Sequence, residues 1–284
     1  ILATTMEDQG RGIAVDSNDN IYITGSAGGA LDGNTYAGSA DIVIAKYDFN
    51  GNKLWTQLLG TSESDGGYGI AVGSDDKIYI TGRTDGDLDG NTNTGGNEIF
   101  TAKYDTNGNK LWTQLLGASI EQGFSIAADS NDNIYITGFT YGDLDGNTNT
   151  GGNDIFIAKY NASGNKQWTQ LLGTSENDWS WSVAVDSYDS IYITGYTGGD
   201  LDGHTNAGDD DIFLIAPLKP SITLASPNGG EKLSVGETLE INWTSIGVPF
   251  VKIEYSINAG TDWITISEQV SKQSGVPSSS KSWS

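Results

Sequence analysis

A block of about 57 residues recurs along this 284-residue chain and limits the folds that it can adopt. The run Ile-Tyr-Ile-Thr-Gly occurs four times at nearly equal spacing, around Tyr22, Tyr79, Tyr135 and Tyr192. The run Trp-Thr-Gln-Leu-Leu-Gly occurs three times at the same spacing, beginning at Trp55, Trp112 and Trp168. Regular self-similarity at such a period is typical of solenoids, propellers and arrays.

Each block predicts one small antiparallel sheet. The third copy contains four short apolar runs: Phe124–Ala128, Ile134–Thr137, Ile155–Tyr160 and Gln167–Leu172. Clusters of Asn, Asp, Ser and Gly join the first run to the second and the third to the fourth, which indicates hairpins. A longer polar loop, residues 142–153, joins the two hairpins and makes the period longer than the roughly 40–45 residues of a WD40 blade. A four-stranded sheet per repeat favours an all-β fold, a β-propeller of four-stranded antiparallel blades.

The four copies, residues 1–216, differ at the two ends of the array. The fourth copy lacks the Trp-Thr-Gln-Leu-Leu-Gly strand, whereas residues 1–12 align with residues 58–69. Ile1-Leu2 therefore look like the end of a fourth strand, which in a closed ring would complete the final blade. Four copies stand at the lower limit of about 4–8 blades, so we favour a fragment of a larger ring over a closed four-bladed one.

A different module follows the repeats. Two prolines mark residues 217–220 as a linker. Residues 221–284 contain four expected strands separated by turn signals, 222–224, 239–243, 251–255 and 263–266. Short strands with frequent turns predict a small β-sandwich. Residues 278–284 stop within a strand-like run, so we expect this sandwich to be truncated.

The charge of the chain argues against two classes of partner. The net charge is −23, of which residues 1–216 carry −22 and residues 217–284 carry −1. Nucleic acids and anionic membranes both require basic surfaces, so neither is expected to bind. No apolar run approaches the roughly 18–20 residues of a membrane span, so no membrane insertion is expected. The acidity has two interpretations, solubility in a salty or extracellular medium and cation binding.

The middle loop of each copy is the candidate site. Its pattern Asp-Leu-Asp-Gly-Asn-Thr-Asn alternates oxygen-bearing side chains around a glycine, as calcium prefers. The candidate calcium ligands are Asp87, Asp89, Asn91 and Asn93 in the second copy, Asp143, Asp145, Asn147 and Asn149 in the third, and Asp200, Asp202 and Asn206 in the fourth. The alternative is turn chemistry, in which the Asp and Asn side chains stabilise turns by hydrogen bonding to nearby backbone groups. The loops lack a glutamate at EF-hand spacing, so both interpretations stay open.

Catalytic motifs are missing from the sequence. The chain has no cysteine and one histidine, His204, which replaces an asparagine of the repeated loop. It contains no Gly-x-Ser-x-Gly elbow and no phosphate-binding loop that ends in Gly-Lys-Ser/Thr. Because acidic residues recur in every copy, no single acid/base pair is marked out for glycoside hydrolysis. The chain is therefore expected not to be an enzyme and to hold no cofactor other than calcium.

The repeats resemble the SBBP family of bacterial β-propeller repeats. The resemblance rests on Ala-Val-Asp-Ser-Asn-Asp-Asn-Ile-Tyr-Ile-Thr-Gly at 14–25, Asp-Ile-Phe-Ile-Ala-Lys-Tyr at 154–160 and Asn-Gly-Asn-Lys-Leu-Trp-Thr at 107–113. The segment Ser-Pro-Asn-Gly-Gly-Glu-Lys at 226–232, together with Ile-Asn-Trp-Thr at 241–244, is similar to the Ig-like domain of the Ser/Thr-rich yeast cell-wall family. Both resemblances imply a bacterial protein that is extracellular or on the cell surface.

These observations predict a non-catalytic binding or adhesion module. Its polar loops would present Asp, Asn and Gly residues to a glycan, a protein or calcium. One alternative is an architectural spacer within a large surface protein. Another is an accessory region of a secreted polysaccharide-degrading enzyme.

Overall fold

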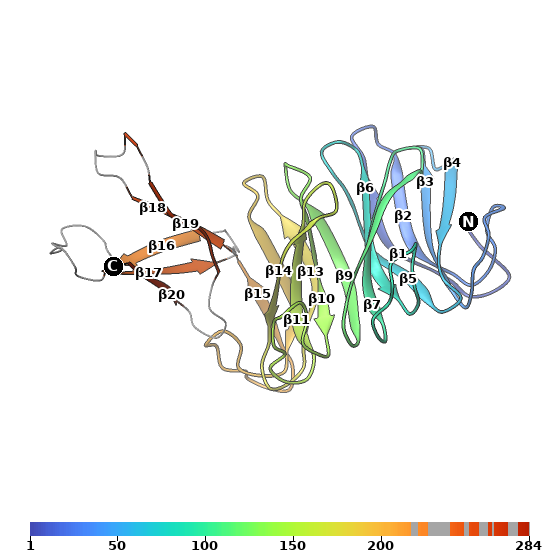
Figure 1. The fold of residues 1–284 in the computed structure, drawn as a ribbon. Helices are drawn as coiled ribbons and strands as arrows, with labels where there is room; N and C mark the ends of the chain where they lie inside the picture. Colours follow the sequence, from blue (N-terminus) through green and yellow to red (C-terminus); the bar gives the residue numbers. More distant parts are fainter. Residues whose placement is uncertain are drawn as a thin grey trace. The chain divides into compact units, whose positions relative to one another are not determined.

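The computed structural model describes residues 1–216, 221–226, 239–246, 250–255, 261–262, 264–271 and 278–283, and the regular elements in them are β-strands (Figure 1). Contacts within the chain divide it into two units, residues 1–216 and 217–284. Within the described residues, no helix has the length and apolar character needed to cross a bilayer.

The first unit contains four antiparallel sheets, and within each sheet neighbouring strands follow one another in sequence (Figure 1). Blade 1 is β1 (Asp8–Val15), β2 (Ile21–Ala27), β3 (Asp41–Tyr47) and β4 (Lys53–Leu59). Blade 2 is β5 (Asp65–Val72), β6 (Ile78–Thr84), β7 (Glu98–Tyr104) and β8 (Lys110–Leu116). Blade 3 is β9 (Glu121–Ala128), β10 (Ile134–Thr140), β11 (Asp154–Tyr160) and β12 (Lys166–Leu172). Blade 4 is β13 (Asp178–Val185), β14 (Ile191–Thr197) and β15 (Asp211–Ile215).

The cores of this unit lie between the sheets. One cluster joins Tyr22 and Ile44 of blade 1 to Ile70 and Phe100 of blade 2, and a second joins Tyr79 of blade 2 to blade 3 in the same way. The second and third strands of the internal blades are covered on both faces, which explains why their sequences are apolar without alternation. The prediction of stacked four-stranded blades is confirmed.

The two ends of the stack leave apolar residues uncovered. Ile13 and Val15 of blade 1 are 69% and 55% exposed, whereas Ile70, at the same repeat position as Ile13, is 9% exposed. Ile212 and Leu214 of β15 are 90% and 69% exposed. Burial at these positions therefore depends on a neighbouring blade, and within residues 1–216 the two end faces have none.

The expectation that Ile1-Leu2 form the end of a fourth strand is wrong, and they do not complete the last blade as they would in a closed ring. Residues 1–7 belong to no strand, and β13–β14–β15 is a three-stranded sheet. Leu2 packs instead against Ala27, Leu31 and Val43 of blade 1. The alignment of these residues with 58–69 is nevertheless correct, because Thr4 donates to Asp8 as Thr61 donates to Asp65.

The described parts of residues 217–284 form two sheets. β16 (Ser221–Ser226), β17 (Leu239–Ile246) and β20 (Ser278–Trp283) make one, and β18 (Phe250–Tyr255) and β19 (Ile264–Ser271) make the other. The strands occur close to the predicted positions, but these two sheets do not establish the expected Ig-like sandwich. The predicted linker, residues 217–220, lies outside the described residues.

Candidate functional site

The middle loops use their polar side chains to hold their own backbone. The first Asp of each motif accepts the backbone N–H of the last Asn, at 2.8 Å from Asn93 to Asp87, 2.9 Å from Asn149 to Asp143 and 2.8 Å from Asn206 to Asp200. The Nδ2 groups of Asn91 and Asn147 donate to the carbonyl oxygens of Leu88 and Leu144, each at 3.1 Å. The last Asn of each motif also forms an Asx turn, because its Oδ1 accepts the N–H of the residue two positions later, at 2.9 Å from Gly95, Gly151 and Gly208.

The second Asp of each motif occupies a turn position with positive φ. The φ values are 56° at Asp89, 54° at Asp145 and 50° at Asp202, in the left-handed region where Asp is tolerated. Asp89 pairs with Lys110 on the fourth strand of its blade, and Asp145 pairs with Lys166. Asp32, the equivalent residue of the first copy, pairs with Lys53 at 2.5 Å, so this Asp is engaged by an ammonium group in three of the four loops.

The structure does not gather the loop carboxylates into a metal-binding cluster. Within the described part of the chain, no group of three or more His, Cys, Asp or Glu side chains is placed to hold a metal ion. The geometry favours turn chemistry, and calcium binding by these loops stays a prediction. Calorimetry on chelator-treated protein tests it, because binding would release heat and raise the melting temperature.

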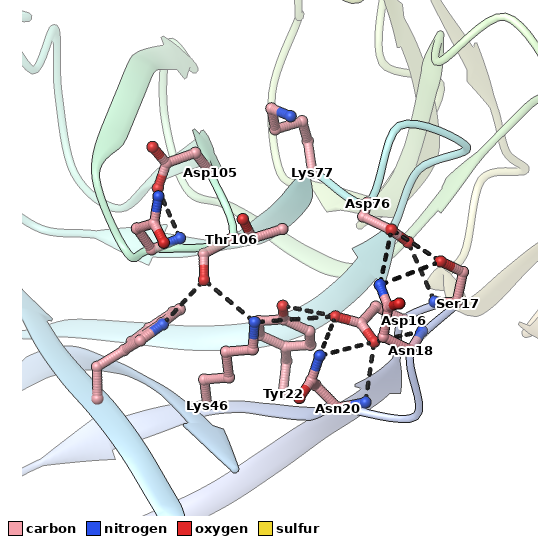
Figure 2. A network of polar contacts seen from close by, with 12 residues as sticks. Asp16, Ser17, Asn18, Asn20, Tyr22, Lys46, Asp76, Lys77, Asp105 and Thr106 are labelled. Atoms are coloured by element: carbon pink, nitrogen blue, oxygen red, sulfur yellow. Dashed lines mark hydrogen bonds and ion pairs between the residues drawn. The ribbon is translucent and has the colours of Figure 1, made fainter. Parts of the chain in front are cut away.

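A polar network ties the first turn of a blade to its second and third strands (Figure 2). In blade 1, the hydroxyl of Tyr22 donates to Asp16 at 2.9 Å, and Asn20 closes the turn onto the same carboxylate. The ammonium of Lys46 lies 3.9 Å from Asp16 and 5.1 Å from the centre of the Tyr22 ring. Burial, followed by the bond to Asp16, raises the pKa of Tyr22, so this phenol stays a donor.

The same network reaches across to the next blade. The carbonyl oxygen of Thr106, in the β7–β8 turn of blade 2, accepts from Lys46 at 3.2 Å and from the indole N–H of Trp55 at 3.1 Å. Figure 2 shows Thr106 facing Lys46 from the neighbouring blade. Lys103 and Trp112 repeat both bonds to Ala162 of blade 3. Trp55 and Trp112 therefore fasten the fourth strand of one blade to the last turn of the next.

A second set of residues occupies one position on the first strand of each blade. That position is a β-bulge, because the pairing with the second strand shifts register there in every blade. The bulged residues are Arg11, Tyr68, Phe124 and Trp181. A bulge redirects the side chain of its extra residue, and bulges are common beside functional sites. We refer to these four residues as the bulge row.

The members of the bulge row contact one another from blade to blade. The guanidinium of Arg11 lies 4.2 Å from the centre of the Tyr68 ring. Tyr68 meets Phe124 edge to face at 5.7 Å, and Phe124 stacks on Trp181 at 4.4 Å. Trp179 adds a second aromatic layer, stacked on Phe139 at 4.2 Å. One cation and a series of aromatic rings thus form a continuous line across four first strands.

This line is accessible at both ends. Arg11 is exposed, Tyr68 and Phe124 are partly buried, and Trp181 is 49% exposed. At the Arg11 end, Gln9, Arg11 and Ser26 contribute to the lining of a pocket of about 230 Å³. Exposed aromatic faces beside hydrogen-bonding groups form a surface for ligands with an apolar face and polar edges.

The family comparison matches the repeat at four places. The model described as "Beta-propeller repeat", SBBP, matches residues 6–31, 54–89, 111–145 and 167–202. The chain carries four SBBP β-propeller repeats. Each of the last three SBBP segments spans the fourth strand of one blade and the first two strands of the next. Each therefore includes one member of the bulge row and one junction between blades.

Two curated proteins are similar over part of their length. One is "Regulatory protein FlaEY" of Caulobacter vibrioides, 29% identical over 187 residues, which covers 57% of this chain and 19% of the relative. The other is an uncharacterized WD repeat-containing protein of Acanthamoeba polyphaga mimivirus, 28% identical over 221 residues, which covers 60% of this chain and 16% of the relative. This SBBP chain therefore spans less than a fifth of either relative.

A solved structure shares a distant overall similarity. It is the crystal structure of a protein of unknown function from Bacteroides caccae, with a TM-score of 0.40 and 9% identity over 83% of this chain and 70% of that one.

The bulge row was not predicted from the sequence, although the repeat carries a signal for it. Within the SBBP repeats, the bulged position holds a different residue in each copy, while the Ile-Tyr-Ile-Thr-Gly run beside it does not change. A position that differs among copies of one scaffold is not fixed by the scaffold. Aligning the copies and selecting such positions would have pointed to this row.

Proposed function

We propose that this SBBP chain is a non-catalytic binding or adhesion module of the extracellular space or cell surface, and that it binds a glycan along the bulge row. The observation that carries the proposal is the continuous line from Arg11 to Trp181, with a half-exposed indole at its end. Sugar rings present apolar C–H faces and polar edges, which suit an aromatic platform flanked by amide and hydroxyl groups.

The charge of the chain narrows the class of glycan. With a net charge of −22 over residues 1–216, the repeats disfavour polyanions such as nucleic acids and sulfated polysaccharides, so a neutral glycan is the expected ligand. The extracellular location is proposed because the acidic, cysteine-free repeats resemble repeats of secreted and surface proteins. The proposal that residues 221–284 form an Ig-like domain fits the same setting.

A second candidate function is that of an architectural spacer. The middle loops favour it, because the carboxylates and amides of Asp87, Asn91 and Asn93 are engaged within their own loop and blade. On this alternative, the aromatic line only packs the first strands together, and no ligand is expected.

A glycan array, followed by titration of the best neutral glycan, separates the two functions. Binding by the unmodified chain should fall at least about tenfold in Trp181→Ala, which corresponds to about 1.4 kcal/mol. Tyr188→Ala is the control, because Tyr188 is an exposed aromatic residue of the same blade outside the bulge row. Equal loss in both variants, or no glycan bound above background, would contradict the proposal and favour the spacer.

A further inference from the structure

Every junction between blades brings two carboxyl groups together. The first residue of the third strand in one blade lies beside the first residue of the next blade. The backbone fixes this arrangement, because the second partner of each pair donates its N–H to the residue that precedes the first: Asp65 to Ala40 at 2.8 Å, Glu121 to Asn97 at 2.8 Å and Asp178 to Asn153 at 2.7 Å. The junction pairs are Asp41 with Asp65, Glu98 with Glu121, and Asp154 with Asp178.

The junction pairs are buried without a basic partner. Each of the six residues is at most 1% exposed. None of the ion pairs found among the described residues includes any of them. Hydroxyl and N–H donors supply part of their solvation: Thr174 donates twice to Asp178, at 2.6 and 2.9 Å, and Thr150 donates twice to Asp154, each at 2.9 Å.

Three of the carboxyl oxygens have no donor. Oδ1 of Asp41, Oδ1 of Asp154 and Oδ1 of Asp178 are buried and accept no hydrogen bond. The last junction is the most deficient in hydrogen-bond donors, because two of these three oxygens belong to it. Thr140 donates to Glu121 at the second junction, whereas the equivalent Thr197 donates to the carbonyl oxygen of Gly199. A buried acceptor without a donor is costly, and a buried carboxylate more so.

A shared proton resolves both problems. Two carboxylates side by side in a buried site cannot both stay ionised, because their repulsion adds to the cost of desolvation. At every junction a proton held by one partner removes one charge, and at the first and last junctions it also provides a donor for an unpartnered oxygen. A metal ion fits less well, because calcium takes six to eight oxygen ligands and the groups that surround these pairs are mostly N–H and O–H donors.

We propose that each junction pair holds one proton between its two carboxyl groups, so that the stacking of the blades tightens as the medium becomes more acidic. This inference concerns the scaffold and does not depend on glycan binding. It turns three successive junctions into one pH-responsive device, in which loss of the protons in alkaline medium loosens the contacts between blades.

Few charged groups lie near the junction pairs, and they do not offset the raised pKa values of the paired carboxyl groups. Burial raises the pKa of Asp41, and Asp65 raises it further; burial and Glu98 raise that of Glu121, and burial and Asp178 raise that of Asp154. Tyr36 and Asp85 interact with the first junction pair, and Tyr196 interacts with the last; Glu63 and Arg83 act on Asp85, and Asp210 acts on Tyr196. Of these, only Arg83 is basic, and it faces Asp85 at 3.9 Å.

The direction of the pH effect follows from these shifts. A carboxyl group whose pKa is higher in the folded than in the unfolded chain binds more protons when folded. Stability therefore rises as the pH falls through the folded-state pKa, until it reaches the pKa of the unfolded chain. Asp8, Asp16 and Asp32 have lowered pKa values and act in the opposite direction, but only below the ordinary range for Asp.

Urea unfolding of the whole chain between about pH 5 and pH 8 tests the proposal. The midpoint of the unmodified chain should fall as the pH rises. Asp154→Asn replaces a carboxyl group with a neutral amide of the same shape, so its midpoint should fall less steeply and exceed that of the unmodified chain at the alkaline end. Asp209→Asn removes an exposed charge of blade 4 and should leave the slope unchanged.

A spectroscopic titration gives a second, independent readout. Carbon-13 NMR or infrared titration of the unmodified chain should detect carboxyl groups that stay protonated near neutral pH. An unmodified chain with a flat profile and no protonated carboxyl near neutral pH would overturn the proposal. So would a steep profile that Asp154→Asn leaves unchanged, or a calcium-dependent rise in midpoint that Asp154→Asn abolishes, which would indicate a cation in place of the proton.

Discussion

Ser17 donates to the carboxylate of Asp76 twice, through its backbone N–H at 3.0 Å and its hydroxyl at 2.8 Å, across the junction between blades 1 and 2. The second and third junctions repeat the contact, from Ser74 to Asp132 and from Ser130 to Asp189. Each accepting Asp occupies the left-handed turn position of its first hairpin, so one residue shapes its own turn and fastens the preceding blade.

Removing this contact should weaken one junction. Asp132→Ala should lower the free energy of unfolding by about 1–3 kcal/mol more than Asp19→Ala, because it removes two hydrogen bonds to a charged group. Asp19 is the matched control: its φ of 61° is close to the 58° of Asp132, and it makes no contact across a junction in the described residues. Equal losses in urea titrations would show that only turn strain matters.

The buried tyrosines should respond oppositely to loss of their hydroxyl groups. The hydroxyl of Tyr22 donates to Asp16, whereas that of Tyr79 has no partner, because Gly73 occupies the position of Asp16 in blade 2. Tyr22→Phe should cost about 1 kcal/mol. Tyr79→Phe should be neutral or stabilising, because it removes an unsatisfied buried group. Thermal or urea unfolding measures both, and a loss at Tyr79 equal to that at Tyr22 would contradict the assignment.

Two turn glycines with the same φ should differ in their tolerance of alanine. Gly51 and Gly164 both have φ of 81°, so alanine is strained in each. A Cβ at Gly51 meets nothing within 4 Å, whereas at Gly164 it meets the ring of Trp112 at 2.9 Å. Gly164→Ala should therefore destabilise the chain by roughly 1 kcal/mol more than Gly51→Ala, within the usual cost of overpacking. Matching urea midpoints would show that the indole moves aside freely.

The tryptophans of the fourth strands should contribute unequally to the free energy of unfolding. Trp112 lies over the turn of blade 3 and donates to Ala162 at 3.4 Å. Trp168 contacts the ring of Tyr135 in its own blade, and the part of the chain described here provides no equivalent turn beyond it. Trp112→Ala should cost about 3–5 kcal/mol, the usual range for a packed aromatic residue, and Trp168→Ala clearly less. Equal costs in urea titrations would place the packing energy within single blades.

The blade itself could be predicted because local and repeated signals agree. The Ile-Tyr-Ile-Thr-Gly runs specify second strands, and the Asn/Asp/Gly clusters specify hairpins, so the strands expected in the third copy fall within a few residues of β9, β10, β11 and β12. The alignment of residues 1–12 with residues 58–69 was correct, but the strand expected at Ile1-Leu2 does not form. A strand needs a neighbouring strand to pair with, and an alignment does not supply one.

The candidate surfaces could not be predicted because they depend on neighbouring blades. Tyr68 and Phe124 belong to different copies of the repeat and meet only after the blades stack. The pairing of Asp154 with Asp178 arises from a backbone bond between two blades. The middle loops were predicted as a site because their acidic pattern is visible within a single copy. Their geometry in the structure is that of turns. In a repeat protein, contacts between copies carry information that the pattern within one copy lacks.

Native-state hydrogen exchange tests the central claim, that each blade is stabilised by its neighbours, most directly. Asp132→Ala lies at the junction between blades 2 and 3, and it should speed amide exchange in β5–β8 and β9–β12 together, whereas Asp19→Ala should not. If Asp132→Ala speeds exchange only in blade 3, which contains the substitution, the blades are independent and the account is contradicted.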